Sequence, residues 1–197
     1  MIVALRLVAL IASLAVAAAA LAQSDGLQDI TRLMKQGQHS QALERVNQYL
    51  SAKPRDAQGR FLKGLIMVEQ NRVPEAIEVF SKLSQDYPEL PEPYNNLAVL
   101  YAAQGQYEKA RQSLEMSIRT HPSYATAYEN LGDVYSKLAS QAYDKALQLD
   151  SSNTAAQSKL SLVRELISAA SRAERSGSAK AGEPVKPTTP AKPTIIA

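Results

Sequence analysis

A repeat with a period of 34 residues runs through the middle of this chain and constrains its fold more than any other feature. Three independent series of residues share that step: Pro54, Pro88 and Pro122; Ala42, Ala76 and Ala110; and the turn formers Gly37, Asn71 and Gly105. A period of this length is typical of a helix–turn–helix unit repeated in tandem. The sequence therefore predicts an all-α fold built from stacked helical pairs.

The spacing inside one unit has a direct physical interpretation. Apolar residues recur at helical spacing, the chain turns at a glycine, and a second apolar set follows. In residues 91–124 these positions are Tyr94, Leu97, Ala98, Tyr101, Gly105, Ala110 and Leu114. The small Ala110 allows the two helices to approach closely. Pro122 comes after the second helix, where no amide donor is needed, and marks the end of the unit.

These residues resemble the tetratricopeptide repeat (TPR) family, whose 34-residue pattern runs aromatic, Leu-Gly, Tyr, Ala, aromatic, Pro. We place four units at residues 23–56, 57–90, 91–124 and a shortened 125–153. The last unit matches through Tyr128, Leu131, Gly132, Tyr135, Ala139 and Tyr143, with Ser151 in place of the proline. The second unit departs from the pattern by carrying Arg60 and Lys63 at positions that are usually apolar. The resemblance implies a helical-repeat solenoid.

The last unit lacks its internal turn. Tyr135 and Ala139 are four residues apart, whereas the equivalent Tyr101 and Ala110 are nine apart, so five residues including the turn glycine are missing. We therefore predict that the two helices of residues 125–153 are fused into one. Residues 154–175 are predicted to form a capping helix over the exposed end of the array. The alternative is that the long helix exchanges with a second chain and forms a homodimer.

The two ends of the chain differ from the repeats. An apolar run follows Arg6 and ends at a small-x-small pattern, which predicts a signal peptide over residues 1–22, cleaved after Ala22. A retained anchor is the alternative. A cleaved signal implies a periplasmic or secreted protein without stable membrane insertion. Residues 176–197 carry prolines at a step of three and are predicted to be a disordered tail, or alternatively an extended spacer.

Composition excludes several classes of function. With 22 basic and 19 acidic residues, the chain lacks the dense positive charge expected of a nucleic-acid partner. It has no cysteine, which excludes disulfides and thiolate metal sites. Its two histidines, His39 and His121, fall at positions that the repeat already explains. No metalloprotease, phosphate-loop or nucleophile-elbow motif occurs. We therefore expect no enzyme activity, no cofactor and no metal.

The resemblance implies a protein–protein interaction module that binds a peptide or protein segment along the concave groove of the repeats. The residues that match the groove positions of the family are Asn95, Asn96, Val99, Glu129, Asn130 and Asp133. Asn96 and Asn130 are one period apart, and their amides could hold the backbone of an extended peptide. Because the face carries acids rather than lysines, a neutral or basic segment is the better ligand. The alternative is an architectural subunit that self-associates through the fused helix and cap.

Overall fold

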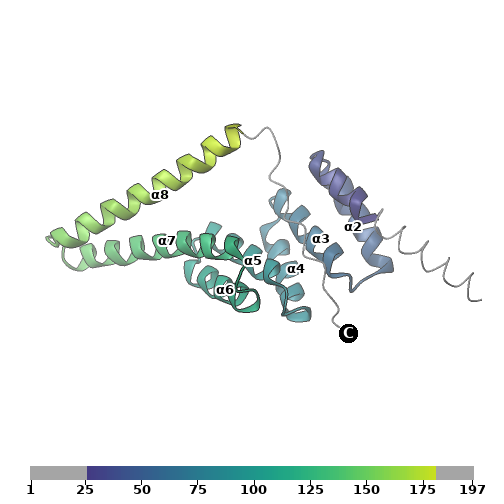
Figure 1. Ribbon diagram of the computed structural model, residues 1–197, viewed down its shortest axis with the longest axis horizontal. Helices are drawn as coiled ribbons and strands as arrows, with labels where there is room; N and C mark the ends of the chain where they lie inside the picture. The colour runs from purple at the N-terminus through teal and green to yellow at the C-terminus, as the bar shows by residue number, and fades with distance from the viewer. Residues whose placement is uncertain (1–25, 181–197) are drawn as a thin grey trace, which may run out of the picture. The chain divides into compact units, whose positions relative to one another are not determined.

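The computed structural model describes residues 26–180, and every regular element in that range is an α-helix (Figure 1). Residues 26–35 form the first helix. The others are α2 (His39–Ala52), α3 (Ala57–Glu69), α4 (Val73–Asp86), α5 (Pro91–Ala103), α6 (Tyr107–Thr120), α7 (Ala125–Leu149) and α8 (Thr154–Lys180). This all-helical architecture confirms the predicted fold class. The predicted signal peptide lies outside the described residues.

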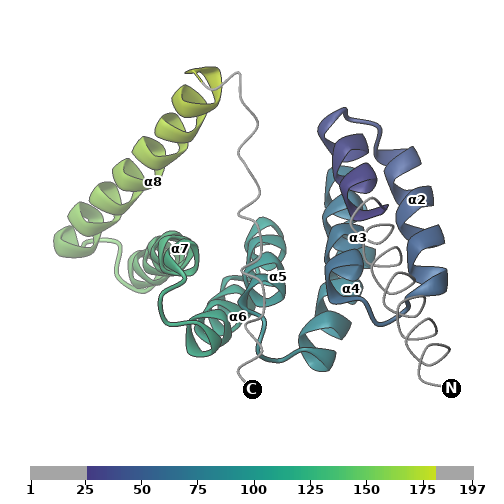
Figure 2. The same cartoon turned by 45° about the vertical axis from the view of Figure 1, so that its right-hand side comes forward.

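The chain divides into two compact units, and the boundary falls inside α7. The first unit ends at Val134 and the second begins at Tyr135. In the first unit, α2 to α6 pack in chain order as antiparallel helical pairs (Figure 2). The second unit contains the C-terminal half of α7 together with α8.

The predicted turns occur where the three series placed them. Gly37, Asn71 and Gly105 all adopt left-handed backbone conformations, with φ of 70°, 57° and 73°. A left-handed residue reverses the chain between the two helices of each unit, and glycine and asparagine tolerate it best. The sequence signal for these turns is therefore confirmed.

Helix ends follow the same period. Pro54, Pro88 and Pro122 each lie two residues beyond the end of a second helix, and Ser151 has that place after α7. Side-chain caps fix two of the helix starts. The Asp56 carboxylate accepts a hydrogen bond of 2.6 Å from the Gly59 amide, and Asn153 Oδ1 accepts one of 2.9 Å from the Ala156 amide.

Close packing of the first helix of a unit against its second helix builds the core of the first unit. A methyl group built on Gly64 of α3 would lie 2.6 Å from the Phe80 ring of α4, so only glycine fits there. The next unit uses Ala98 and Leu114 at the same repeat positions, and both are buried. A hydrogen bond of 2.9 Å from Ser117 Oγ to the Pro91 carbonyl joins α6 to α5.

Arg60, one of the two departures from the repeat pattern, is accounted for by its surroundings. Its guanidinium forms an ion pair of 2.6 Å with Asp86, although the side chain is only 16% exposed. The same group lies 5.9 Å from the centre of the Tyr87 ring. An arginine can fill an aromatic position here because its stem packs while its charge is paired.

Helix α7 is continuous from Ala125 to Leu149, which confirms the predicted fusion of two helices. Its first half has consequently lost the second helix that should cover it. Tyr128 and Tyr135 are 50% and 49% exposed, whereas Tyr94 and Tyr101, at the same repeat positions of the preceding unit, are only partly exposed. Fusion therefore leaves aromatic core positions in solvent.

Helix α8 begins at Thr154 and packs on the second half of α7 near its start. Ala156 and Leu160 are buried, and Arg164 forms an ion pair of 2.8 Å with Asp144. The helix continues to Lys180, so the predicted end at residue 175 was five residues too early. That part of the predicted tail is helical because no proline occurs before residue 184. The remainder, residues 181–197, lies outside the described range.

We expect Gly64→Ala to lower the free energy of unfolding by about 1 to 3 kcal/mol, because the added methyl group would overpack the Phe80 ring. Urea unfolding measures this loss. Lys63→Ala on the same helix is the control and should change stability by less than about 0.5 kcal/mol. Equal stabilities for the two variants would contradict the close helix contact.

Candidate functional site

The first helices of the four units place one set of repeat positions on a common face of the first unit. Stepping by 34 from Asn130 leads back to Asn96, Leu62 and Gln28, and stepping from Asp133 leads to Val99, Leu65 and Thr31. We call these eight residues, together with Asn95 and Glu129, the first-helix face. The face is polar at both ends and apolar in the middle. Leu62 belongs to the core, and Leu65 packs against it.

A hydrogen bond between two asparagine side chains joins the helices that carry the predicted site. Asn130 Nδ2 donates to Asn95 Oδ1 at 2.8 Å, from the first half of α7 to α5. Asn95 is 7% exposed, so this amide pair is largely shielded from water. The sequence predicted that Asn130 acts together with Asn96, one period away. In the structure, Asn130 contacts Asn95 instead.

The other predicted residues differ in their exposure. Asn96 is partly buried, and its Nδ2 donates to the Glu92 carbonyl of the same helix at 2.8 Å. Val99 is 49% exposed. Glu129 and Asp133 are exposed, and neither takes part in any of the ion pairs of the described region. These four side chains therefore keep a polar or apolar group available to a ligand.

Sequence reasoning missed a hollow at the N-terminal end of this face. The hollow has a volume of about 480 Å³ and is lined by Leu27, Gln28, Thr31, Arg32, Lys35 and Gln58. Gln28 and Thr31 lie at the repeat positions of Asn130 and Asp133, so the same step of 34 could have identified them. The divergence of the first unit from the family pattern obscured that signal.

Charged side chains beside this hollow form ion pairs with one another and with α2. Asp29 forms ion pairs with Arg32 and, at 3.2 Å, with Arg45 of α2. The Arg32 hydrogen bond is the main cause that lowers the pKa of the Asp29 carboxyl. Lys35 is exposed and belongs to none of the ion pairs among the described residues. The two ends of the first-helix face therefore carry opposite charge.

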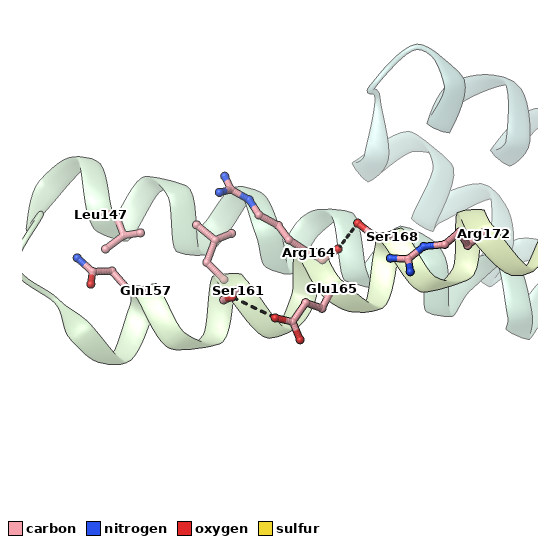
Figure 3. Close-up of a pocket in the computed structure, with 8 residues that line it drawn as sticks. Leu147, Gln157, Ser161, Arg164, Glu165, Ser168 and Arg172 are labelled. Atoms are coloured by element: carbon pink, nitrogen blue, oxygen red, sulfur yellow. Dashed lines mark hydrogen bonds between the residues drawn. The ribbon is translucent and has the colours of Figure 1, made fainter.

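A second hollow, of about 520 Å³, lies in the second unit between α7 and α8 (Figure 3). Leu147 of α7 and Gln157 of α8 face it, and Arg164 and Arg172 line it further along α8. Ser168 Oγ donates to the Arg164 carbonyl within the same helix at 2.8 Å. The hollow is an open gap between two helices. Arg164 pairs with Asp144 of α7 at 2.8 Å, whereas Ser161 and Ser168 bond within α8.

The first-helix face can bind a chain in extended conformation. Carboxamides donate and accept hydrogen bonds, as peptide groups do. Exposed carboxylates at Glu129 and Asp133 favour a positive side chain nearby. Next to this end, burial and then the charge of Glu92 raise the pKa of the Tyr124 phenol, which remains a neutral donor at pH 7.

Helical pairs with a 34-residue step and left-handed turns define this molecule as a TPR-like protein. Sequence comparison adds a more specific assignment. Residues 1–133 match the family described as "Virulence factor membrane-bound polymerase, C-terminal", and the chain belongs to that family.

Other similar proteins share the repeat. The tetratricopeptide repeat domain-containing protein PYG7, chloroplastic, of Arabidopsis thaliana is 29% identical over 116 residues, which cover 54% of this chain and 38% of that protein. This chain therefore spans well under half the length of that relative. TPR folds generally mediate protein–protein interactions, and proteins with this fold are typically non-catalytic.

Solved structures show the same fold. PilF of Pseudomonas aeruginosa aligns with a TM-score of 0.55 and 19% identity, covering 83% of this chain and 78% of that one. A thermophilic TPR protein of Thermus thermophilus aligns with a TM-score of 0.54 and 22% identity, covering 72% and 80%. The second TPR domain of human RPAP3, solved with an HSP70 peptide, aligns with a TM-score of 0.52 and 15% identity, covering 57% and 95%.

Within the described residues 26–180, no cluster of His, Asp and Glu could hold a metal ion. None of the helices in that range combines the length and the apolar character needed to cross a membrane.

The Asn95–Asn130 hydrogen bond predicts unequal effects of two alanine substitutions. Asn130→Ala should lower the free energy of unfolding by about 1 to 3 kcal/mol, because it leaves the buried Asn95 oxygen without a donor. Asn96→Ala should cost less than about 0.5 kcal/mol, since its amide bonds only to its own helix. Urea unfolding of both variants measures the difference, and equal losses would contradict the pairing.

Proposed function

We propose that this chain is a non-enzymatic interaction module of the bacterial envelope, which binds an extended, neutral or basic peptide segment along its first-helix face. The hydrogen bond of 2.8 Å between Asn130 and Asn95 carries the proposal. It fixes two adjacent first helices so that their amides act as one unit. Asn130, which is partly buried, then keeps its oxygen as an acceptor for a peptide backbone, while the buried Asn95 holds it in place.

The distribution of charge supports a basic or neutral ligand. Glu129 and Asp133 flank the amide pair, and both are exposed. A positive side chain next to Asp133 would gain an ion pair, because Asp133 belongs to none of the ion pairs of the described region. Val99, 49% exposed, offers an apolar contact one turn away from Asn95 and Asn96. An anionic peptide would meet like charge at this end of the face.

Two observations support a location in the envelope. The first residues have the composition of a signal peptide, with cleavage proposed after Ala22. The description of the family that matches residues 1–133 names a membrane-bound protein. A module released into the periplasm could bind segments of envelope proteins without spanning the membrane. A retained N-terminal anchor would instead hold the same face close to the membrane surface.

Peptide binding can be tested with two synthetic probes of equal length, one of alternating alanine and lysine and one of alternating alanine and glutamate. The full-length chain should bind the lysine probe in fluorescence polarisation and bind the glutamate probe more weakly. Asp133→Lys should weaken binding of the lysine probe about tenfold, because it replaces attraction by repulsion. Binding should also weaken as salt is added.

Glu44→Lys is the matched control, because it makes the same charge change at an exposed position of α2 that is not on the first-helix face. Its binding should stay close to that of the unchanged chain. If Asp133→Lys and Glu44→Lys weakened binding equally, net charge and not the face would be responsible, and the assignment would be wrong.

Mass spectrometry of the chain recovered from a bacterial envelope fraction tests the proposed compartment. We expect a mature chain that begins at Gln23 in the periplasmic fraction. An intact N-terminus in the membrane fraction would overturn cleavage and favour the retained anchor. Ala22→Asp is expected to block processing, because signal peptidase sites require small neutral residues.

A further inference from the structure

The first half of α7 exposes the surface that a first helix normally buries. Tyr128 and Tyr135 are 50% and 49% exposed. The same repeat positions in α5 are Tyr94 and Tyr101, which are only partly exposed because α6 packs against that helix. The repeat pattern thus specifies a covering helix for α7. Because the two helices of the last unit are fused, the chain cannot fold its own second helix back over this surface.

The residues of the missing helix are still present, further along α7 itself. In the second repeat unit, Gly64 lies directly against the Phe80 ring. The corresponding residues of the last unit are Gly132 and Tyr143, at a separation of 143 − 132 = 11 residues on one helix. Eleven residues span roughly 16 Å of a straight helix, so these two cannot meet within one chain. A methyl group built on Gly132 would have no atom of the described residues within 4 Å.

We propose that a second copy of this chain covers the exposed face, with the two α7 helices antiparallel. Tyr143 of one copy then packs against Gly132 of the other, as Phe80 packs against Gly64. One helical turn before Gly132, Tyr128 lies next to Ala146 of the second copy. One turn after Gly132, Tyr135 lies next to Ala139 of the second copy. A two-fold axis near residues 137 and 138 relates the two copies. One interface therefore completes two repeat units at once.

Helix α8 reaches the edge of this face of α7. Its Lys159 Nζ lies 6.0 Å from the ring centre of Tyr143, which is about 40° from Ala139 around the helix, and its Arg164 pairs with Asp144 at 2.8 Å. Asp144 is five residues after Ala139, which places it about 140° away around the helix. Ala139 and Ala146 are only partly buried. The alanine side of the second half of α7 thus remains available to another helix while α8 covers a different side.

Charge complementarity also favours a second copy. Asn95 of one unit bonds to Asn130 of the next at 2.8 Å. The equivalent positions one unit later are Glu129, since 95 + 34 = 129, and Lys159, since 130 + 34 − 5 = 159 once the five missing residues are subtracted. In the proposed dimer, Glu129 of one copy therefore contacts Lys159 of the other. Both side chains are exposed, and neither belongs to an ion pair among the described residues. The two-fold axis generates this opposite-charge contact twice.

The exposed apolar side chains supply more than half of the area that such an interface requires. Tyr128, Tyr135 and Leu149 are 50%, 49% and 79% exposed. At about 200 Å² for a large side chain, the two copies together offer on the order of 700 Å² from these residues alone. A stable interface buries about 1,200 Å² or more. The stems and alanines along two helices of 25 residues can supply the remainder.

The absence of cysteine from the chain makes crosslinking a direct test. Tyr128→Cys and Ala146→Cys are made as separate full-length variants, co-expressed, and treated with a short bismaleimide. We expect a covalent dimer when the two variants are present together. Either variant alone should give little, because like residues of the two copies lie roughly 27 Å apart, or 18 residues along the helices.

Gln148→Cys replaces Ala146→Cys as the matched control, because residue 148 is exposed and lies about 160° away around α7. Equal crosslinking with either partner, or none with Ala146→Cys while circular dichroism shows a folded chain, would overturn the proposal. Analytical ultracentrifugation of the unchanged chain gives an independent result. A concentration-dependent dimer is expected, and a monomer at all concentrations would also overturn it.

Charge reversal tests the register. Glu129→Lys should raise the dimer dissociation constant about threefold to tenfold, and adding Lys159→Glu should restore most of the loss. Failure of the double variant to recover would contradict the antiparallel register. Association and peptide binding are measured separately, so a chain that dimerises without binding either probe would contradict only the proposed function.

Discussion

The second and third repeats of this protein depend on close contact between a small residue of the first helix and a large residue of the second. Gly64 against Phe80 is the tightest example, with no room for a methyl group. Ala98 and Leu114 repeat the contact with a slightly larger small residue, and both are buried. The left-handed turns at Gly37, Asn71 and Gly105 make it possible, because they return the chain within a few residues. The remaining contacts between helices build on this pairing.

Loss of one such turn changes what the same residues can do. The last repeat keeps its small residue at Gly132 and its aromatic at Tyr143, but a continuous α7 holds them apart. A contact that is intramolecular elsewhere can be satisfied here only by a separate helix. The deletion of five residues therefore converts part of the core into surface. The same physical preference that stabilises the other repeats then favours association between chains.

The candidate site was predicted in part. The step of 34 identified the first-helix positions and the asparagines, because position within a repeat determines which side of a helix a residue lies on. It could not show which amides meet. Asn130 bonds to Asn95 rather than acting together with Asn96, because the relative rotation of two packed helices decides that geometry. The hollow at Gln28 and Thr31 shares the same step, but its departure from the family pattern concealed it.

The sequence by itself determined the helical repeat, the turns, the helix ends and the fusion of α7, since each follows from local backbone preferences and from spacing along the chain. Only the tertiary structure decided how side chains are shared between helices. It showed that Arg60 fills an aromatic position by pairing with Asp86, and that Tyr128 and Tyr135 are left half exposed. It also extended α8 to Lys180. Local rules fix elements, whereas burial and pairing depend on which surfaces the packed elements bring together.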